Sequence, residues 1–124
     1  YFSPKTKVIA AEPETADDAY RSFKGKEFYP SLNPNTMADG LRTSLGTLTF
    51  PIILEHVNDI ITCSEQGIVD AMRLVWERMK IIIEPSSAVP LAALMEHKTD
   101  IKGKRVAIIF SGGNAELDTL PWNQ

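Results

Sequence analysis

Short apolar runs alternate with helix-patterned segments along this chain, and this alternation restricts its fold more than any other feature. Strand-like runs occupy residues 7–13, 59–64 and 101–110, the last beginning with a polar turn and ending in the strongest expected strand. Helices are expected at residues 15–23, part of 48–57, 65–80 and 86–96. Such alternation implies crossover connections. It predicts an α/β fold, an open, twisted, mostly parallel sheet with flanking helices, in a single region over residues 1–124.

The clearest helical pattern covers residues 65–80, with Ser64 placed to cap the first turn. Its apolar positions recur at helical spacing: Ile68, Met72, Val75, Trp76 and Met79. Thr15 is the expected N-cap of the shorter helix at residues 15–23. Residues 24–40 are rich in Pro, Gly and Asn and predict a long irregular loop. Loops of this length in compact domains tend to be functional.

Charge and cysteine content exclude several classes of function. The 13 basic and 16 acidic residues are interspersed, so no basic stripe for nucleic acid is present. No apolar stretch is long enough to span a membrane. The single cysteine, Cys63, cannot form an internal disulfide, which favours a reducing, cytoplasmic setting. The chain opens without an initiator methionine and reaches a strand-like run almost at once, which favours a piece of a longer protein.

The strongest expected strand runs into the sequence SGGN at residues 111–114. Ligands of parallel sheets bind beyond the carboxyl ends of the strands, and glycines there allow close approach to the backbone. The pattern is neither G-x-G-x-x-G nor a Walker loop, so the spacing favours neither a dinucleotide nor a nucleoside triphosphate. On these four residues alone, a tight turn and a ligand site both remain open.

Five ordered segments carry a family resemblance that extends over residues 8–118. They are EPETADDAYRS, TMADGLRTSLG, LVWERMK, IIEPSSAVPLAAL and IIFSGGNAELD. In this order and at these separations they resemble the C-terminal part of the serine racemase and threonine/serine dehydratase family, which are pyridoxal 5′-phosphate (PLP) enzymes of fold type II. The resemblance implies part of the large domain of such an enzyme.

The resemblance assigns the cofactor-binding residues. Ser111 would place its hydroxyl against the pyridine nitrogen of PLP, a neutral partner that makes the ring a weaker electron sink than an aspartate does. Gly112 and Gly113 would give clearance to the flat ring, and Asn114 would fix the turn by side-chain hydrogen bonds. Gly40 and Glu84 match positions lining the pocket. The alternatives are a plain turn for Gly40 and an acid placed before a helix N-terminus for Glu84.

A divalent-cation site is also implied, in the first Glu-Pro segment. Glu12, Ala16 and Asp18 match the site of the serine racemase-like branch, where two carboxylates and one backbone carbonyl hold the ion. Mg²⁺, Ca²⁺ and Mn²⁺ all prefer oxygen ligands and accept waters for the rest. The alternative is a pair of acidic residues at a solvated helix start.

No catalytic residue is expected in this chain. Lys24, in the sequence SFK, imitates the tripeptide around the family's Schiff-base lysine, but it is followed by GKEF and lies downstream of the cation segment. We therefore interpret Lys24 as a solvated lysine. The family's lysine, its opposite-face serine and its phosphate-binding glycine loop belong to an N-terminal part that is absent here. The chain alone is expected to be inactive.

The resemblance implies a parent enzyme that acts on L-serine, L-threonine or D-serine. Removal of the α-proton and loss of the β-hydroxyl would give a 2-oxo acid and ammonia, whereas reprotonation on the other face would give racemisation. A 3-hydroxyaspartate dehydratase of the same fold and a non-catalytic regulatory or interaction module are the alternatives. Further expected partners are the remainder of the enzyme chain and a second copy in a homodimer, with ATP as a possible effector near Lys80 and Asn114.

Overall fold

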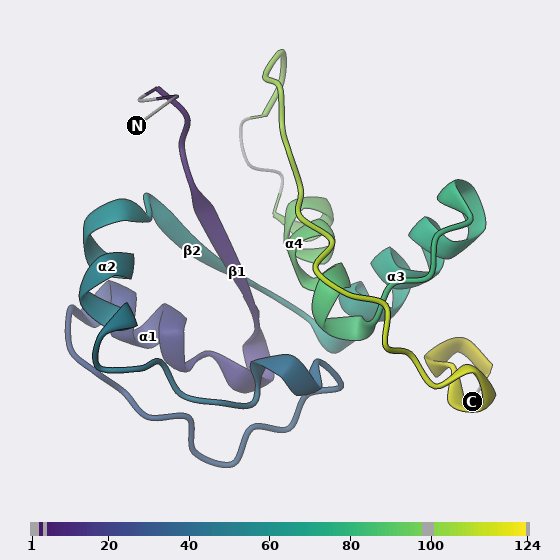
Figure 1. The fold of residues 1–124 in the computed structure, drawn as a ribbon, viewed down its shortest axis with the longest axis horizontal. Coiled ribbons are helices and arrows are strands. Elements are labelled where there is room, and N and C mark those ends of the chain that lie inside the picture. Colours follow the sequence, from purple (N-terminus) through teal and green to yellow (C-terminus); the bar gives the residue numbers. More distant parts are fainter. Residues whose placement is uncertain (1–2, 4, 98–100, 124) are drawn as a thin grey trace.

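The computed structural model describes residues 3, 5–97 and 101–123 of the chain. Two strands and four α-helices form in this part of the chain (Figure 1). In chain order they are β1 (Ile9–Pro13), α1 (Asp18–Gly25), α2 (Thr49–His56), β2 (Asp59–Cys63), α3 (Glu65–Met79) and α4 (Pro85–Glu96). Single 3-10 turns lie at Glu14–Ala16, Asp39–Leu41, Leu117–Thr119 and Pro121–Asn123. The expected order of elements is confirmed up to residue 96.

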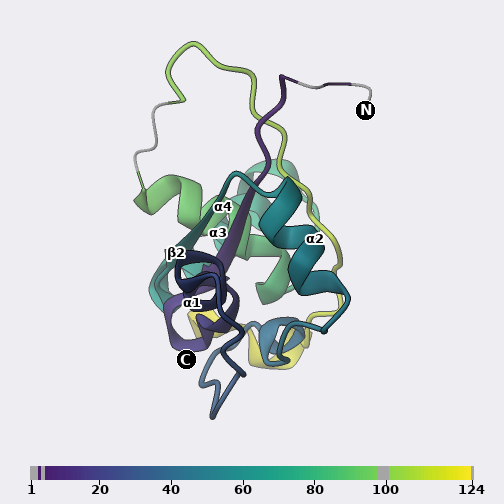
Figure 2. The same ribbon diagram turned by 90° about the vertical axis from the view of Figure 1, so that its left-hand side faces the viewer.

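The two strands form a parallel pair between two layers of helices. Ile9 lies opposite Asp59 and Pro13 lies opposite Cys63. Helices α1 and α2 lie on one side of the pair, and α4 lies on the other side with α3 beyond it (Figures 1 and 2). Helix α4 packs against both strands, and α1 packs against β2. The α/β class with a parallel sheet is therefore confirmed, in a small and open form.

The core lies mainly between α3 and α4. Small side chains on α4 allow the two helices to approach closely, and larger ones on α3 fill the space between them. The fully buried core positions of these helices are Ile68, Ala71, Met72, Val75, Ala88, Val89, Ala92 and Ala93. The Ser64 hydroxyl accepts a hydrogen bond from the Gly67 amide at 2.9 Å, which confirms the expected cap of α3. The helix ends at Met79, and the next residue, Lys80, has a left-handed φ of 59°.

The strand expected within residues 101–110 is not formed. Residues 104–110 are extended but belong to neither strand nor helix, and Val106 and Ile109 are 49% and 79% exposed. A strand needs a neighbouring strand to satisfy its backbone groups, and the sheet in the described residues consists of β1 and β2 alone. The prediction of a strand at residues 101–110 is therefore wrong for this structure. The segment is apolar, but it pairs with neither β1 nor β2.

The expected N-cap of α1 is also wrong. Helix α1 begins at Asp18, and Asp17 occupies the cap position without a capping side-chain bond. The helix end is held instead by Glu12, whose carboxylate accepts hydrogen bonds from the amides of Ala19 and Tyr20 at 3.3 and 2.6 Å. Thr15 turns away and donates its hydroxyl to the Glu65 carboxylate at 2.6 Å. The Glu12 carboxylate, at the end of β1, therefore takes the capping role that was expected of Thr15.

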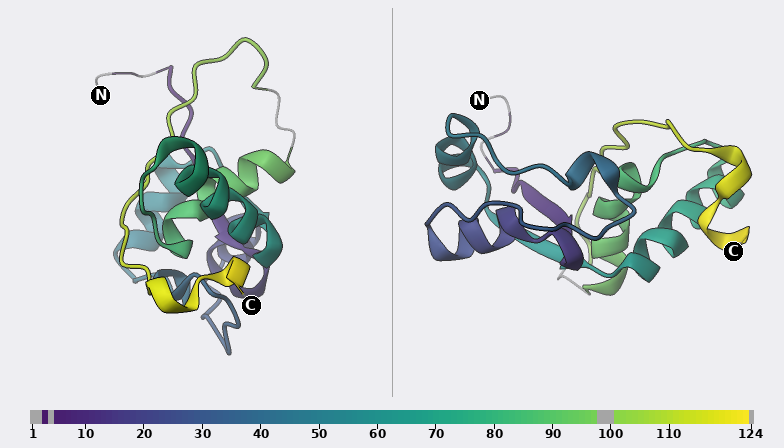
Figure 3. Two further views of the ribbon diagram at one scale, coloured as in Figure 1. Left: turned by 90° about the vertical axis from the view of Figure 1, so that its right-hand side faces the viewer. Right: turned by 90° about the horizontal axis from the view of Figure 1, so that it is seen from below.

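The C-terminal part of the chain runs beside α4 and closes on α3 (Figure 3). The Trp122 ring meets Trp76 of α3 edge to face, with 5.3 Å between ring centroids. The Trp76 indole also donates to the Ile83 carbonyl at 2.9 Å. These contacts hold the residues after the SGGN turn and the segment before α4 against the end of α3. None of the helices in the described residues is both long and apolar enough to cross a bilayer.

Candidate cofactor pocket and cation site

The SGGN turn lies against the N-terminal end of α4. The amide of Glu84 donates to the Gly112 carbonyl at 3.1 Å, and the amide of Asn114 donates to the Glu84 carboxylate at 3.0 Å. Two segments far apart in sequence are thereby joined by reciprocal bonds. Glu84 and residues 111–114, which were expected to share a pocket, do lie together. Asn114 joins this arrangement through its backbone amide, and its expected side-chain role stays a prediction.

Two serines in the first turn of α4, Ser86 and Ser87, complete the arrangement. The Ser87 hydroxyl is 1% exposed, accepts from the Gly112 amide at 2.7 Å and donates to the Gly112 carbonyl at 2.7 Å. It also lies 3.2 Å from the Ser111 hydroxyl. Sequence reasoning missed both serines. Adjacent hydroxyls directly after Glu84 and Pro85, at a helix start, were the signal that could have found them.

Gly40 approaches the same helix end from the loop between α1 and α2. Its amide donates to the Asp39 carboxylate at 2.8 Å and to the Ser86 hydroxyl at 3.1 Å, and the Ser86 hydroxyl donates to Asp39 at 3.3 Å. A Cβ on Gly40 would lie 3.1 Å from the Ser86 oxygen. The structure thus brings Gly40 to the end of α4 that also receives the SGGN turn.

Gly112 and Gly113 are needed for packing within the chain. A Cβ on Gly112 would lie 2.7 Å from the Glu84 carboxylate, and one on Gly113 would lie 2.5 Å from the Ile82 carbonyl oxygen. Backbone atoms cannot move aside easily, so Gly113 is the more restricted of the two. The close approach to residues 82–84 explains both glycines without a ligand, and their clearance to a cofactor ring stays a prediction.

The resulting site combines the hydroxyl of Ser111 with the carboxyl group of Glu84. Ser111 is exposed, so its hydroxyl can donate to or accept from a ligand. Its known partner is another hydroxyl, at 3.2 Å, and not a charged group. The Ser111 hydroxyl, which the buried Ser87 contacts, is an uncharged partner and suits an uncharged ring nitrogen. The residues present therefore fit the pyridine edge of PLP, with Ser111 as the group that would hold it.

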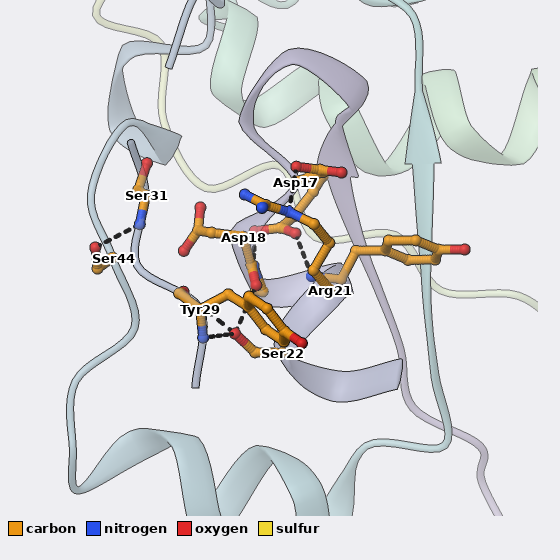
Figure 4. Close-up of polar contacts among 10 residues, drawn as sticks. Asp17, Asp18, Arg21, Ser22, Tyr29, Ser31 and Ser44 are labelled. Atoms are coloured by element: carbon orange, nitrogen blue, oxygen red, sulfur yellow. Dashed lines mark hydrogen bonds and ion pairs between the residues drawn. The ribbon is translucent and has the colours of Figure 1, made fainter. Parts of the chain in front are cut away.

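A second site surrounds the start of α1. Asp18 is 2% exposed, and neither of its carboxylate oxygens has a hydrogen-bond partner. In Figure 4 the Asp18 carboxylate points toward the loop that carries Ser31, and the dashed lines shown lead to other groups. Burial raises the pKa of Asp18, although its own backbone amide, the nearby Ser31 hydroxyl and Arg21 partly oppose this shift. An unpartnered buried carboxylate is costly and is commonly explained by an ion.

Glu12 lies next to Asp18 and is also largely buried. Burial is the main cause that raises the pKa of Glu12 to about 7, and the charge of Asp18 adds to this effect. The amides of Tyr20 and Ala19 oppose the shift by donating to its carboxylate. Two carboxylates this close favour a bound cation, because a cation relieves their mutual repulsion.

Ala16 and Asp18 both line a small polar cavity of about 30 Å³. In the described residues there is no cluster of three His, Cys, Asp or Glu side chains that could bind a metal. The expected set contains two carboxylates and one carbonyl, so this finding does not test it. The orphaned Asp18 oxygens, the neighbouring Glu12 and the cavity together fit a hard divalent cation.

Three further residues considered in the sequence analysis are Lys24, Lys80 and Cys63. Lys24 lies on α1 and forms an exposed ion pair with Asp59 of β2, with 2.6 Å between nitrogen and oxygen. Lys80 is the left-handed residue at the end of α3. Cys63 is fully buried, and burial raises the pKa of its thiol to about 12. A thiol of this kind is an unreactive core group at neutral pH.

The parallel strand pair and its flanking helices define an open α/β fold, and polar turns gather at the end of α4. Residues 2–112 match the family model described as pyridoxal-phosphate dependent enzyme. The chain belongs to this family, which confirms the resemblance stated from sequence.

Relatives and solved structures agree with this assignment. The chain is 52% identical to the β-hydroxyaspartate dehydratase of Paracoccus denitrificans, with 98% of the chain and 39% of the relative covered. It is 52% identical to the serine racemase of Dictyostelium discoideum, with 96% and 38% covered, and that enzyme's structure gives a TM-score of 0.85. The structure of maize serine racemase gives a TM-score of 0.89 at 38% identity, with 98% and 38% covered. The chain thus spans about two-fifths of the length of these relatives.

Proposed function

We propose that this chain is the C-terminal part of a PLP-dependent enzyme that dehydrates or racemises small hydroxy amino acids. The supporting observation is the SGGN turn, which Glu84 and Ser87 hold against α4 with Ser111 exposed. When bound, PLP supplies an electron sink for the carbanion formed at the substrate's α-carbon. We infer that Ser111 hydrogen-bonds the ring nitrogen, and that Glu84 and Gly40 line the pocket.

The substrate is proposed to be L-serine, L-threonine or D-serine. The serine racemase of Dictyostelium discoideum supports this choice. The second candidate is a 3-hydroxyaspartate dehydratase, which a relative of equal identity favours. A β-hydroxyl leaving group is common to both. Substrates of the two classes differ in the β-carboxylate that a hydroxyaspartate enzyme must accommodate.

We also propose that Glu12, Ala16 and Asp18 bind a divalent cation. The buried, unpartnered Asp18 oxygens support this site. A cation there would neutralise the carboxylates that flank the start of α1 and fix that helix against the end of β1. A homodimer, a cytoplasmic location and a nucleotide effector near Lys80 and Asn114 are further predictions from the family resemblance.

The test uses the full-length polypeptide that contains this chain, purified with PLP. Each hydroxy amino acid is supplied in turn, and the 2-oxo acid, ammonia and opposite enantiomer are measured. We expect pyruvate or 2-oxobutanoate from serine or threonine, and Ser111→Ala should lower the rate by roughly tenfold or more, which is the scale of one lost hydrogen bond to a polarised group. Turnover of 3-hydroxyaspartate alone would select the second candidate. Turnover of none would contradict the proposal.

A further inference from the structure

The small polar cavity at the proposed cation site has a positively charged side chain in its wall. Of the described residues that line this cavity, Arg21 is the one with a positive charge. Asp17 and Asp18 line the same cavity, and the carboxyl group of Glu12 lies near enough to interact with both of them. Three carboxyl groups and one guanidinium therefore determine the electrostatic potential where we propose that the ion binds.

Two contacts hold the Arg21 guanidinium beside the cavity. Its Nε donates to the Asp17 carboxylate at 2.9 Å, and its central carbon lies 5.8 Å from the centroid of the Tyr29 ring. Tyr29 is itself tied to α1, because its amide donates to the Ser22 hydroxyl at 2.9 Å. In the view of Figure 4 the guanidinium lies between the carboxylates of Asp17 and Asp18. The positive charge is thus fixed in position by groups on both sides.

Asp18 is close enough to interact with this charge but forms no hydrogen bond with it. Both of its carboxylate oxygens are unpartnered, and the charge of Arg21 opposes the rise in the pKa of Asp18 that burial causes. Arg21 therefore acts on Asp18 through space and leaves both oxygens available to an ion. A fixed positive charge here stabilises the ionised carboxylates when no ion is bound, and it repels a cation that enters the cavity.

We propose that Arg21 sets the cation affinity of this site, by partly neutralising Asp18 and Glu12 in the ion-free protein and by repelling the divalent ion that binds between them. This inference rests on the proposed cation site and concerns a residue outside its three ligands. Coulomb energy is proportional to the charge of the ion, so Arg21 repels a divalent ion twice as strongly as a monovalent one. Arg21 thereby makes folding less dependent on the ion and makes ion binding weaker.

The experiment uses the full-length polypeptide that contains this chain, freed of metal, and measures Ca²⁺ binding by titration calorimetry. Arg21→Gln should bind Ca²⁺ more tightly than the wild type by roughly threefold to thirtyfold, the Coulomb scale for a unit charge that acts on a divalent ion across a hydrated cavity. Arg21→Lys keeps the charge and should remain close to the wild type. The difference should shrink as KCl is added, because the Arg21 side chain is 46% exposed and salt screens such a charge.

Thermal unfolding of the same variants provides a second measurement. In the presence of a chelator, Arg21→Gln should unfold at a lower temperature than the wild type, and excess Ca²⁺ should close or reverse this difference. Arg73→Gln is the matched control. It breaks an ion pair of the same spacing on α3, with 2.7 Å between Arg73 and Glu77, and should leave Ca²⁺ affinity unchanged.

The outcomes separate the role of Arg21 from the cation site itself. If neither the wild type nor Arg21→Gln binds Ca²⁺, the proposed site is overturned and the inference with it. If both bind Ca²⁺ with equal affinity, only the role of Arg21 is overturned. The same holds if Arg21→Gln lowers the unfolding temperature equally with chelator and with Ca²⁺, or if it no longer tightens binding in an Asp17→Asn background, since Arg21 would then act only by masking Asp17.

Discussion

Glu12 holds its carboxylate at the end of β1, where it caps α1 and lies beside Asp18. Burial raises its pKa from 4.5 to about 7, so between these two values the folded chain binds a proton that the unfolded chain has released. The contribution to folding stability is therefore complete below about pH 4.5 and is lost as the pH rises through about 7. The raised pKa of Asp18 acts in the same direction.

With divalent cations chelated, we expect the protein to be less stable at pH 8 than at pH 5 by on the order of 3 kcal/mol from Glu12. Urea unfolding at the two pH values measures this difference. Added Ca²⁺ or Mg²⁺ should restore stability at pH 8, because a cation binds the ionised carboxylates. Glu12→Gln should flatten the pH dependence. An identical dependence in the wild type and this variant would count against the assignment.

At the scale of elements, Glu65 at the start of α3 connects two loops. Its carboxylate accepts from the Thr15 hydroxyl at 2.6 Å and from the Met37 amide at 2.9 Å. One loop leads into the proposed cation site, and the other leads into the turn that carries Gly40. A single side chain of α3 thus fixes the approach of both loops to the central strands.

We expect Glu65→Ala to destabilise the protein by about 1–3 kcal/mol, because it leaves two donors without their partner. Hydrogen exchange should rise at residues 34–42 more than in the rest of the chain. Glu65→Gln can keep both bonds and should remain close to the wild type. Gln66→Ala, on the neighbouring exposed position, is the control, and equal exchange in both alanine variants would refute the link.

The elements differ in how far the sequence could predict them. Helix α3 was predictable because its capping residue and its apolar spacing are both local signals. Residues 104–110 were not, because an apolar run specifies a strand only where another strand is available to pair with it. The predicted cap of α1, Thr15, was wrong for a related reason. The carboxylate that caps the helix belongs to Glu12, which lies in the preceding strand.

At the scale of the whole molecule, an apolar groove of about 480 Å³ separates α3 and α4 from the extended C-terminal segment. It is lined by Leu74, Val75, Arg78, Met79, Leu91, Val106, Ile108 and Phe110. Ile109 beside it is 79% exposed. Exposed apolar grooves often mark sites of association between proteins.

The 124-residue chain by itself is therefore expected to self-associate and to bind a hydrophobic dye. Sedimentation equilibrium should give an average mass above the 13.8 kDa of one chain. Val106→Ser combined with Ile109→Ser should lower that mass, whereas Leu32→Ser, a 74% exposed position in the loop before the Gly40 turn, should not. A monomer at every concentration would show that the groove is not adhesive.

The candidate sites were predictable mainly where the ordered motifs reached them. The motifs assigned Glu84, Gly40 and Ser111 to one pocket, and the structure brings all three to the start of α4, while their contact with a cofactor stays a prediction. Ser87 was missed because its importance depends on a contact with Gly112, 25 positions away, that no local pattern reports. The packing role of Gly113 against Ile82 was missed for the same reason.

The Glu12 carboxylate accepts hydrogen bonds from two amides of α1. These bonds affect how substitutions of Glu12 and Asp18 should be interpreted across homologous sequences. Glu12 caps a helix, so selection for folding retains an oxygen-bearing side chain there even in a lineage that has stopped using the ion. Asp18 makes no hydrogen bond through its carboxylate and gives the fold no such reason to keep it. Loss of the acid at position 18, and not at position 12, is the change that should track loss of cation dependence during evolution.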